Sequence, residues 1–503
     1  MKLRFKNYIP IILIILLAIF LRFVNINSNP PSMYGDELTL VYDAYSILKT
    51  GHDQTGAFLP LTFAMSEGRP PAYVYLTVPL VAAFGPTAFA ARFFSLVSGV
   101  GIVLLLYLIL KSLVSERVAT IGALFAAISP WDLSLSRGGF ETHLALFLSL
   151  LGVYAAVRAK VRPWYLLISG ISFGLAIFTY HSYKVVVPAF LPFLLWFIDL
   201  KQLIKDKKFR KSFIIGATAF LFFVSFWLYQ VIGGSEIRFQ NTSLLSNAKL
   251  SSTITEKVNT ERTLDNSPFK VIIHNRPVEY LTTLGDNYFS HFSFDFLFLH
   301  GDGNPRHNQG LMGEMYIADS LLVLLGIIFL WQKYKKVALL LGGWMIVSPL
   351  ATMVVSPAHA LRSTFLLPPL LILSATGFTY LLELSRDKWV AKLVFFAVVL
   401  GIITQFIFLV DRVYYLYPKQ FGNFWSLSAK TASEDALAES KKYDYVVLSD
   451  QIDSINLAFP VYVKVDPNQV ISQYNQNVRN FGNIYIGKVS NLPGNVLYIK
   501  NNQ

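Results

Sequence analysis

The sequence predicts an all-α polytopic membrane protein with a long first external loop and a small C-terminal α/β external domain. Of its 503 residues, 54% are hydrophobic and only 15% are charged, and its mean hydropathy is +0.49. A soluble domain carries about 25% charged residues, and so apolar a chain cannot remain disordered in water. The net charge of +13 is typical of Lys and Arg gathered in cytoplasmic loops rather than of nucleic-acid binding. Because the chain has no cysteine, disulfides, thiolate metal sites and a cysteine nucleophile are excluded.

A spanning helix needs about 20 mostly apolar residues, and about eleven segments of the chain meet this need. They lie at residues 9–24, 87–110, 118–131, 139–157, 164–180, 185–199, 212–232, 318–332, 337–355, 363–382 and 390–410. The shorter apolar run 72–84 contains Pro79. It predicts an interfacial or re-entrant helix rather than a further span.

Basic residues alternate between the two sides of these segments. One connecting segment contains Lys201, Lys205, Lys207, Lys208, Arg210 and Lys211, whereas three loops on the opposite side contain one basic residue each: Arg137, Lys184 and Arg362. Basic loops face the cytoplasm. We therefore expect a multi-pass protein of the cell membrane with a cytoplasmic N-terminus and, because the number of spans is odd, an external C-terminus.

The chain is predicted to consist of a transmembrane domain, residues 1–412, and a small external α/β domain, residues 413–503. External loops of the first domain cover about residues 25–71 and 233–317. In the second domain, the β-branched or aromatic runs at 443–448, 461–465, 483–489 and 496–500 predict strands, and 434–442 predicts a helix.

Two adjacent carboxylates, Asp36 and Glu37, follow the outer end of the first span. Neighbouring side chains stand about 100° apart on a helix, so one acid can face a cavity while the scaffold holds the other. This pattern predicts a catalytic pair. The alternative is that both acids stabilise the N-terminus of a helix expected over residues 38–48.

The first loop ends in a short polar segment that re-enters the membrane at a proline pair. It contains Glu67, Arg69 and Tyr73. The prolines stiffen the chain and hold Arg69 at the interface, where a guanidinium suits a lipid phosphate. An ordinary interfacial anchor is the alternative.

Further polar groups lie at three other external turns. In one turn, Arg137, Glu141 and His143 surround a pair of glycines, although Arg137 and Glu141 could simply form an i,i+4 ion pair. The other turns carry His181, Tyr183 and Lys184, and His359 and Arg362. Ionisable groups at a membrane surface favour a site. We expect Arg69, Arg137, Lys184 and Arg362 to bind an anionic donor phosphate, and the remaining predicted substrate-binding residues are Glu67, Tyr73, Glu141, His143, His181, Tyr183 and His359.

The large loop contains His300, Asp302 and His307 within eight residues. These side chains could bind a divalent metal, but their spacing matches no standard ligand pattern. No cofactor is therefore expected to be required. The sequence has no P-loop, dinucleotide fingerprint, serine nucleophile elbow or zinc-protease motif at a sensible position, so the energy for a reaction has to arrive with the substrate.

The order of these motifs resembles a known family. The Asp36-Glu37 pair is followed by the run Ala44-Tyr45-Ser46-Ile47-Leu48-Lys49-Thr50-Gly51-His52-Asp53, then by the Arg69-Pro70-Pro71 re-entry, and then by a turn with Ser129-Pro130, Ser136-Arg137 and Phe140-Glu141. This resembles the bacterial family 39 branch of the GT-C glycosyltransferases. Relatives of that branch include protein O-mannosyltransferases and lipid A aminoarabinose transferases. The resemblance covers residues 1–382 and is densest over 22–185.

The resemblance implies transfer of a sugar from a polyprenyl-phosphate donor to a lipid, glycan or protein acceptor on the outer face of the membrane. The family's first-loop acid matches Asp36, with Glu37 beside it, and two of its basic residues match Arg69 and Arg137. The large loop has no identifiable repeat-type insert of the kind found in protein mannosyltransferases, which leaves a protein acceptor open.

The chemistry also fits these residues without the family. A polyprenyl monophosphate leaves readily once cations neutralise it, and one carboxylate can deprotonate and orient an acceptor hydroxyl. A single base without a covalent nucleophile implies inversion at the anomeric carbon. A transporter or flippase of polyprenyl-linked sugars would instead place ionisable residues at the membrane midplane. A cell-envelope polymer ligase is a second alternative that the sequence does not separate.

Overall fold

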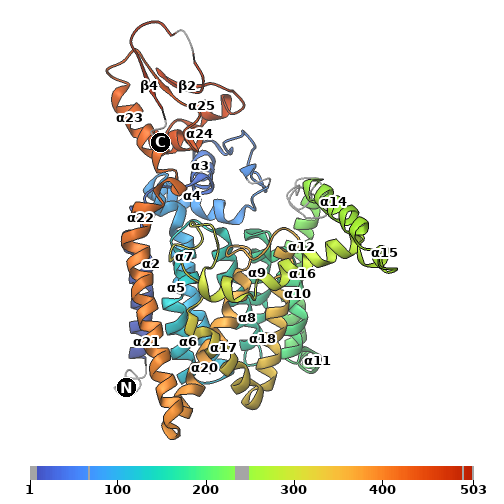
Figure 1. Ribbon diagram of the computed structural model, residues 1–503. Coiled ribbons are helices and arrows are strands. Elements are labelled where there is room, and N and C mark those ends of the chain that lie inside the picture. Colours follow the sequence, from blue (N-terminus) through green and yellow to red (C-terminus); the bar gives the residue numbers. More distant parts are fainter. Residues whose placement is uncertain (1–7, 66–67, 233–247, 490–491, 501–503) are drawn as a thin grey trace.

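The computed structural model describes residues 8–65, 68–232, 248–489 and 492–500. It shows a bundle of helices with a small sheet above one end (Figure 1). Each of the eleven predicted apolar segments contains a helix. These helices are α2 (Ile9–Phe23), α5 (Ala88–Leu113), α6 (Glu116–Ile128), α8 (Glu141–Arg158), α9 (Tyr165–Thr179), α10 (Tyr183–Phe197), α12 (Lys207–Ile232), α17 (Ile317–Lys333), α18 (Lys335–Val347), α20 (Leu367–Asp387) and α21 (Trp389–Asp411).

Within the described residues, five helical stretches are long and apolar enough to cross a membrane. They are Ala88–Leu113, Lys207–Ile232, Lys335–Met353, Thr364–Asp387 and Trp389–Gln420. A sixth span results if α6 and α7 (Pro130–Ser136), which meet at a bend of 54°, are counted together. Shorter apolar helices include α2, α9 and α10. The all-α, multi-pass fold class is thus confirmed.

Close backbone contacts hold the bundle together. Where α17 and α20 pack, a Cβ atom on Gly377 would lie 1.9 Å from the carbonyl oxygen of Leu322, so only glycine permits this approach. Small residues at such crossings are typical of membrane helices. The helix α12 packs closely against α9, but only 6% of its apolar window is fully buried, so its other side is open to lipid.

The first of the loops predicted to be external carries two helices, α3 (Gly35–Thr50) and α4 (Ala72–Phe84). The helix α4 occupies the same residues as the predicted interfacial segment, with Pro79 inside it. The two helices pack against one another above the upper end of the bundle (Figure 1).

The described part of the second external loop begins at residue 248. It contains α14 (Ala248–Leu264), α15 (Lys270–Ile273), α16 (Arg276–Ser290) and the short π-helix η2 (Asp295–Leu299). The helices α14 to α16 form an arm at the side of the bundle (Figure 1).

The C-terminal residues form short helices and a four-stranded sheet. The helical elements are η4 (Arg412–Leu416), α22 (Tyr417–Gln420), η5 (Gly422–Trp425), α23 (Leu427–Glu439), α24 (Ile455–Val463) and α25 (Pro467–Ser472). The strands β1 (Tyr445–Leu448), β2 (Arg479–Phe481), β3 (Ile484–Ile486) and β4 (Val496–Ile499) lie in the order β2-β3-β1-β4. The strand β1 is parallel to both its neighbours, and β2 is antiparallel to β3. This sheet agrees with the predicted α/β character.

One predicted strand, 461–465, is wrong. Its first residues complete the helix α24, which ends where Lys464 adopts a left-handed conformation with φ of 58°. Val461 is buried, and a short apolar run fits a buried helix as well as a strand. The predicted helix at 434–442 exists but begins earlier, as α23.

The tail and the first loop share one hydrophobic core. Apolar side chains of α3 and α4, such as Leu40 and Val74, belong to the same buried cluster as Phe459 of α24 and Ile484 of β3. The hydroxyl of Tyr42 in α3 donates to the carbonyl oxygen of Val465 over 3.0 Å. The tail therefore supports the helix on which Asp36 lies, and the boundary expected at residue 413 stays a prediction.

Candidate active site

A polar cavity of about 220 Å³ lies where the first loop, the large loop and three turns of the bundle meet. Its walls are Tyr34, Asp36, Arg69, Pro70, Phe140, Glu141, Tyr180, His181, Asn304, Arg306, His307, His359, Leu361 and Arg362. Seven predicted site residues are among them: Asp36, Arg69, Glu141, His181, His307, His359 and Arg362. Residues separated by more than three hundred positions in the sequence thus line one small cavity.

Asp36 reaches this cavity from the first turn of α3, where it is only partly buried. Tyr34 is the N-cap residue of α3, and its side chain accepts no hydrogen bond from the first turn of the helix. Asp36 and Glu37 therefore do not cap α3, although an acid in the first turn still interacts favourably with the helix dipole. The carboxylate of Asp36 is placed to meet a ligand in the cavity.

Glu37 points away from the cavity and is fully buried. Arg92 donates to both its carboxylate oxygens, over 2.8 and 2.9 Å, and the backbone N–H of Gly139 donates over 2.7 Å. Arg92 also donates to the carbonyl oxygens of Ile26, Pro30 and Ser32. The interactions of Glu37 thus join α3 to α5 and the first loop, so we expect it to position Asp36 rather than to touch substrate.

Arg92 was not singled out by the sequence analysis, although a lone arginine inside the apolar segment 87–110 is a signal of function or buried pairing. It is fully buried, and its guanidinium carbon lies 5.1 Å from the ring centroid of Trp425. Trp425 in turn contacts Tyr34 edge-on, with 5.2 Å between ring centroids. Tyr34 lines the cavity, so the tail contributes to its support.

Arg69 lies in the wall of the cavity with its donors largely engaged. Its Nε is 2.8 Å from Oε1 of Glu141, and it donates to Oγ1 of Thr39 over 3.2 Å and to the backbone carbonyl of Asp36 over 2.9 Å. Only 3% of the residue is exposed. The ion pair of Glu141 is thus formed with Arg69 and not, as the alternative interpretation supposed, with Arg137.

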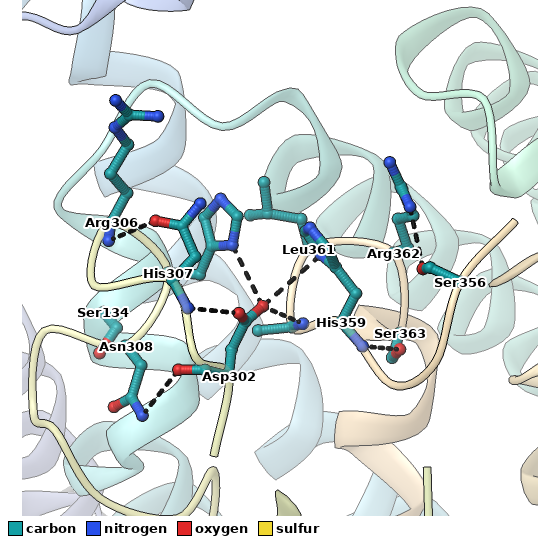
Figure 2. Close-up of polar contacts among 12 residues, drawn as sticks. Ser134, Asp302, Arg306, His307, Asn308, Ser356, His359, Leu361, Arg362 and Ser363 are labelled. Carbon is teal, nitrogen blue, oxygen red and sulfur yellow. Dashed lines mark hydrogen bonds and ion pairs between the residues drawn. The ribbon is translucent and has the colours of Figure 1, made fainter. Parts of the chain in front are cut away.

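Two other arginines line the cavity more freely. The guanidinium of Arg306 lies 5.1 Å from the ring centroid of Tyr34 and donates from Nε to the carbonyl oxygen of Phe424. Arg362 donates to Oγ of Ser356 over 3.0 Å. Figure 2 shows both side chains extending toward the same side of the Asp302 cluster. The sequence analysis missed Arg306, even though it precedes the predicted metal ligand His307.

Arg137 and Lys184 do not line the cavity. Arg137 is fully buried, and it donates to the carbonyl oxygens of Leu21, Arg22 and Val24 at the end of α2 and to that of Asn29 in the first loop. Such carbonyls have no partner within the helix, so Arg137 satisfies them. Lys184 is 8% exposed and lies near the ring of Trp227 and Nδ1 of His181.

Three further predicted substrate contacts are buried outside the cavity. The hydroxyl of Tyr73 donates to the carbonyl oxygen of Ala91 over 3.0 Å. His143 is hydrogen-bonded to Asp132 over 2.9 Å, and Asp132 also pairs with Arg22. The hydroxyl of Tyr183 lies 3.0 Å from that of Thr364. Glu67 lies outside the described residues.

Asp302, His307 and His359 form a group that could hold a metal ion, with one donor atom of each within 4.8 Å of the others. Figure 2 shows Asp302 between the two imidazoles, and its Oδ2 is 3.1 Å from Nδ1 of His307 and 3.6 Å from Nδ1 of His359. The predicted candidate His300 is not in this group. It pairs with Asp295 at the surface, where 78% of its side chain is exposed.

The ionised form of Asp302 and the neutral form of His359 are the forms that bind a cation. Burial raises the pKa of Asp302, but the hydrogen bond and charge of His307 outweigh that effect and hold the pKa well below its usual range. Burial lowers the pKa of His359 to about 3, which keeps the imidazole neutral. Nδ1 of His359 has no hydrogen-bond partner within the described residues.

The comparisons with known proteins give a family match over part of the chain and a fold match over most of it. The family model described as dolichyl-phosphate-mannose-protein mannosyltransferase matches residues 68–229, which is less than half of the chain. This region includes Arg69, Glu141 and His181. No curated protein matches the sequence.

Several solved structures share the fold. ArnT from Cupriavidus metallidurans, solved with undecaprenyl phosphate, is similar with 12% identity and a TM-score of 0.53 over 90% of this chain and 84% of ArnT. The oligosaccharyltransferase AglB from Archaeoglobus fulgidus, solved with an inhibitory peptide and a dolichol-phosphate, has 13% identity and a TM-score of 0.51. That match covers 91% of this chain but only 64% of AglB. A second AglB structure, with Zn and sulfate, has a TM-score of 0.54 and 14% identity over 90% of this chain and 61% of AglB.

This chain has the GT-C fold. The resemblance that the motifs predicted over residues 1–382 is thereby confirmed, and the small C-terminal sheet, which was predicted separately from its strand pattern, is present as well. The cavity with Asp36 is lined by residues of the first loop and of the turns it meets, and the helices α3 and α4 of that loop lie between the upper end of the bundle and the tail (Figure 1).

Proposed function

We propose that this protein is an inverting glycosyltransferase that moves a sugar from a polyprenyl-phosphate donor to a hydroxyl group on the outer side of the membrane. The observation that carries the proposal is the meeting of one partly exposed carboxylate, Asp36, with Arg306 and Arg362 in a single cavity. The fold neighbours solved with dolichol-phosphate and undecaprenyl phosphate support a lipid-phosphate donor.

Asp36 is the proposed base. It accepts the proton of the acceptor hydroxyl as the oxygen attacks the anomeric carbon, and the bond from that carbon to the phosphate oxygen breaks on the opposite side. Glu37 takes no part in this proton transfer because Arg92 and Gly139 already use its oxygens. With one base and no covalent intermediate, the configuration of the sugar is inverted.

Arg306 and Arg362 are the proposed phosphate ligands. As the donor bond breaks, negative charge gathers on the phosphate, and guanidinium groups fixed nearby stabilise it without rearranging. Arg69 contributes to the positive field of the wall, but its hydrogen bonds to Glu141, Thr39 and Asp36 give it mainly a positioning role. Arg137 and Lys184 lie outside the cavity and are no longer proposed as phosphate ligands.

A divalent ion is an optional part of this site. Two imidazoles and one carboxylate are a set of ligands that suits Zn²⁺ and leaves a position for another ligand. Asp302, His307 and His359 would hold the ion, and His307 and His359 also line the cavity. When bound, the ion would supply positive charge toward a phosphate; the roles of Asp36 and the two arginines do not depend on it.

The test is a transfer assay with purified protein, radiolabelled polyprenyl-phosphate sugars and cell-envelope fractions. We expect Asp36→Asn to lower turnover by about 10²–10⁴, while donor binding and unfolding temperature stay unchanged. Asp435→Asn, the same change at an exposed position of α23, is the matched control and should remain active. Equal activity of Asp36→Asn and wild type would refute the proposed base.

A further inference from the structure

The arm formed by α14, α15 and α16 has an apolar tip that nothing in the proposed reaction uses. Residues Phe269, Val271, Ile272 and Ile273 are 59%, 60%, 71% and 51% exposed, and they follow one another around Lys270. Single exposed apolar residues are ordinary, but a contiguous exposed group marks a contact with a partner or a membrane.

The rest of the arm is an ordinary folded hairpin. Ile254 and Val258 of α14 are buried where α14 packs against α16. Lys257 and Glu279 pair across the two helices over 2.6 Å, and Nε of Arg262 donates to the carbonyl oxygen of His274. The arm therefore has its own small core, and the exposed apolar side chains at its tip are not needed to close it.

The base of the arm is fixed to the bundle. Nδ2 of Asn287 donates to the carbonyl oxygen of Met353 over 2.9 Å, and Oγ of Ser290 accepts from the backbone N–H of Ala358 over 2.8 Å. These bonds set the direction in which α16 leaves the bundle.

The position of the tip matches the membrane. Figure 1 shows α15 beside the bundle, lower in the view than α14 and level with the upper part of α12. The helix α12 is a candidate span that packs against α9, yet only 6% of its apolar window is fully buried, and Ile232 at its end is 86% exposed. The apolar tip thus continues, at the same height, a surface that must face lipid.

We propose that the segment Phe269–Ile273 inserts into the outer leaflet of the membrane and anchors the arm there. Interfacial helices bury their apolar side chains about 5–10 Å deep, at the boundary between the lipid headgroups and the acyl chains. Lys270 and Arg276 suit this position, because long basic side chains can extend from an apolar surface to the lipid phosphates. The apolar tip therefore contacts lipid, rather than an acceptor peptide or a second copy of the chain.

The absence of cysteine in the sequence makes a direct test possible. A single Ile272→Cys variant of the full chain is labelled with a nitrobenzoxadiazole dye and placed in nanodiscs at one chain per disc. The matched control is Thr260→Cys, at an exposed position of α14. Quenching is measured with aqueous iodide and with lipids that carry a doxyl group at a shallow position of the acyl chain.

We expect the dye at position 272 to be quenched severalfold more by the doxyl lipid than the dye at 260, and severalfold less by iodide. Equal iodide quenching at both positions would overturn the proposal. Two other results would also overturn the proposal. If the dye at position 272 is shielded from iodide only when two chains share a disc, the tip contacts a second copy of the chain. If the shielding from iodide requires added acceptor, the tip contacts the acceptor. Ile272→Ser, read with a dye at position 271 in Val271→Cys, should reduce lipid quenching if the apolar contact holds the tip in place.

Discussion

Arg69 and Glu141 form an ion pair in the wall of the cavity, with 2.8 Å between Nε and Oε1. Arg69 belongs to the end of the first loop, and Glu141 to the first turn of α8. Their side chains are 4% and 13% exposed. The pair therefore joins a loop to the bundle beside Asp36, and its loss should affect stability as well as the site.

Arg69→Gln should lower the free energy of unfolding, because it removes the guanidinium that pairs with the largely buried carboxylate of Glu141; breaking a buried ion pair costs up to about 3–5 kcal/mol. Thermal unfolding in detergent measures the change. The double variant Arg69→Gln with Glu141→Gln should lose clearly less stability than the sum of the two single variants. Additive losses would show that the two side chains are not coupled.

Glu37→Gln should destabilise the fold through Arg92, whose guanidinium would lose its buried counter-charge, again by about 3–5 kcal/mol. Transfer activity per folded molecule should be retained, in contrast to Asp36→Asn. The two variants are compared by unfolding temperature and by turnover normalised to folded protein. A stable but inactive Glu37→Gln variant would assign the base to Glu37 instead.

Arg306→Ala and Arg362→Ala should each weaken donor binding by about 10- to 100-fold, since a hydrogen bond to a charged group contributes about 1.5–3 kcal/mol. Binding of the polyprenyl-phosphate sugar to protein in nanodiscs is the measurement. Arg137→Ala is the comparison: it should lower the unfolding temperature, because three carbonyls at the end of α2 and that of Asn29 in the first loop lose their donor. If Arg137→Ala folds normally and loses donor binding, the assignment is reversed.

Stability of the first loop should depend on the protonation of Asp43. Burial raises the pKa of this carboxyl to about 7 in the folded protein, above its unfolded value of about 4. The folded state therefore binds the proton more tightly, and this contribution is complete below pH 4 and lost as pH rises toward 7. Asp43→Asn should flatten that part of the pH profile of the unfolding temperature, since its side-chain oxygen can still accept from Gln54 as Oδ1 of Asp43 does. An unchanged pH slope in this variant would contradict the prediction.

Zinc should raise the unfolding temperature of the wild-type chain, since a ligand that binds only the folded state stabilises it by mass action. His307→Ala and His359→Ala should each remove most of the shift. His300→Ala should keep it, because His300 pairs with Asp295 away from the group. A shift that depends on His300 and not on His359 would restore the ligand set expected from the sequence.

Local patterns predicted the helices well. The apolar run at 72–84 was predicted to be a helix too short to span a membrane, and it forms α4 with the same bounds. The run at 461–465 was misassigned as a strand, because Val461 and its neighbours have high β-propensity, and only the packing of α24 on the shared core decides its conformation.

Several residues that line the cavity lie at polar turns and were predicted there, although Arg306 in the large loop was missed; the partners that these residues find on distant helices were not predicted. Asp36 and Arg362 belong to polar turns and line the cavity as expected. The pairing of Glu37 with Arg92, and of Asp302 with His359, depends on how separate helices meet. Arg137 and Arg362 are alike in the sequence, since each is the single basic residue of a short loop. In the structure, however, the guanidinium of Arg137 donates to backbone carbonyls, most of them at the end of α2.

The contact between Trp425 and Arg92 can form only after the whole helical bundle has been synthesised. Residue 92 enters the membrane early in synthesis, whereas the ribosome releases Trp425 only after every helix of the bundle has been made. Until then the apolar side of α3 and the guanidinium of Arg92 lack their cover from the tail. A chain cut short by a premature stop or by a protease after α21 would still insert into the membrane, yet its cavity would be unfinished.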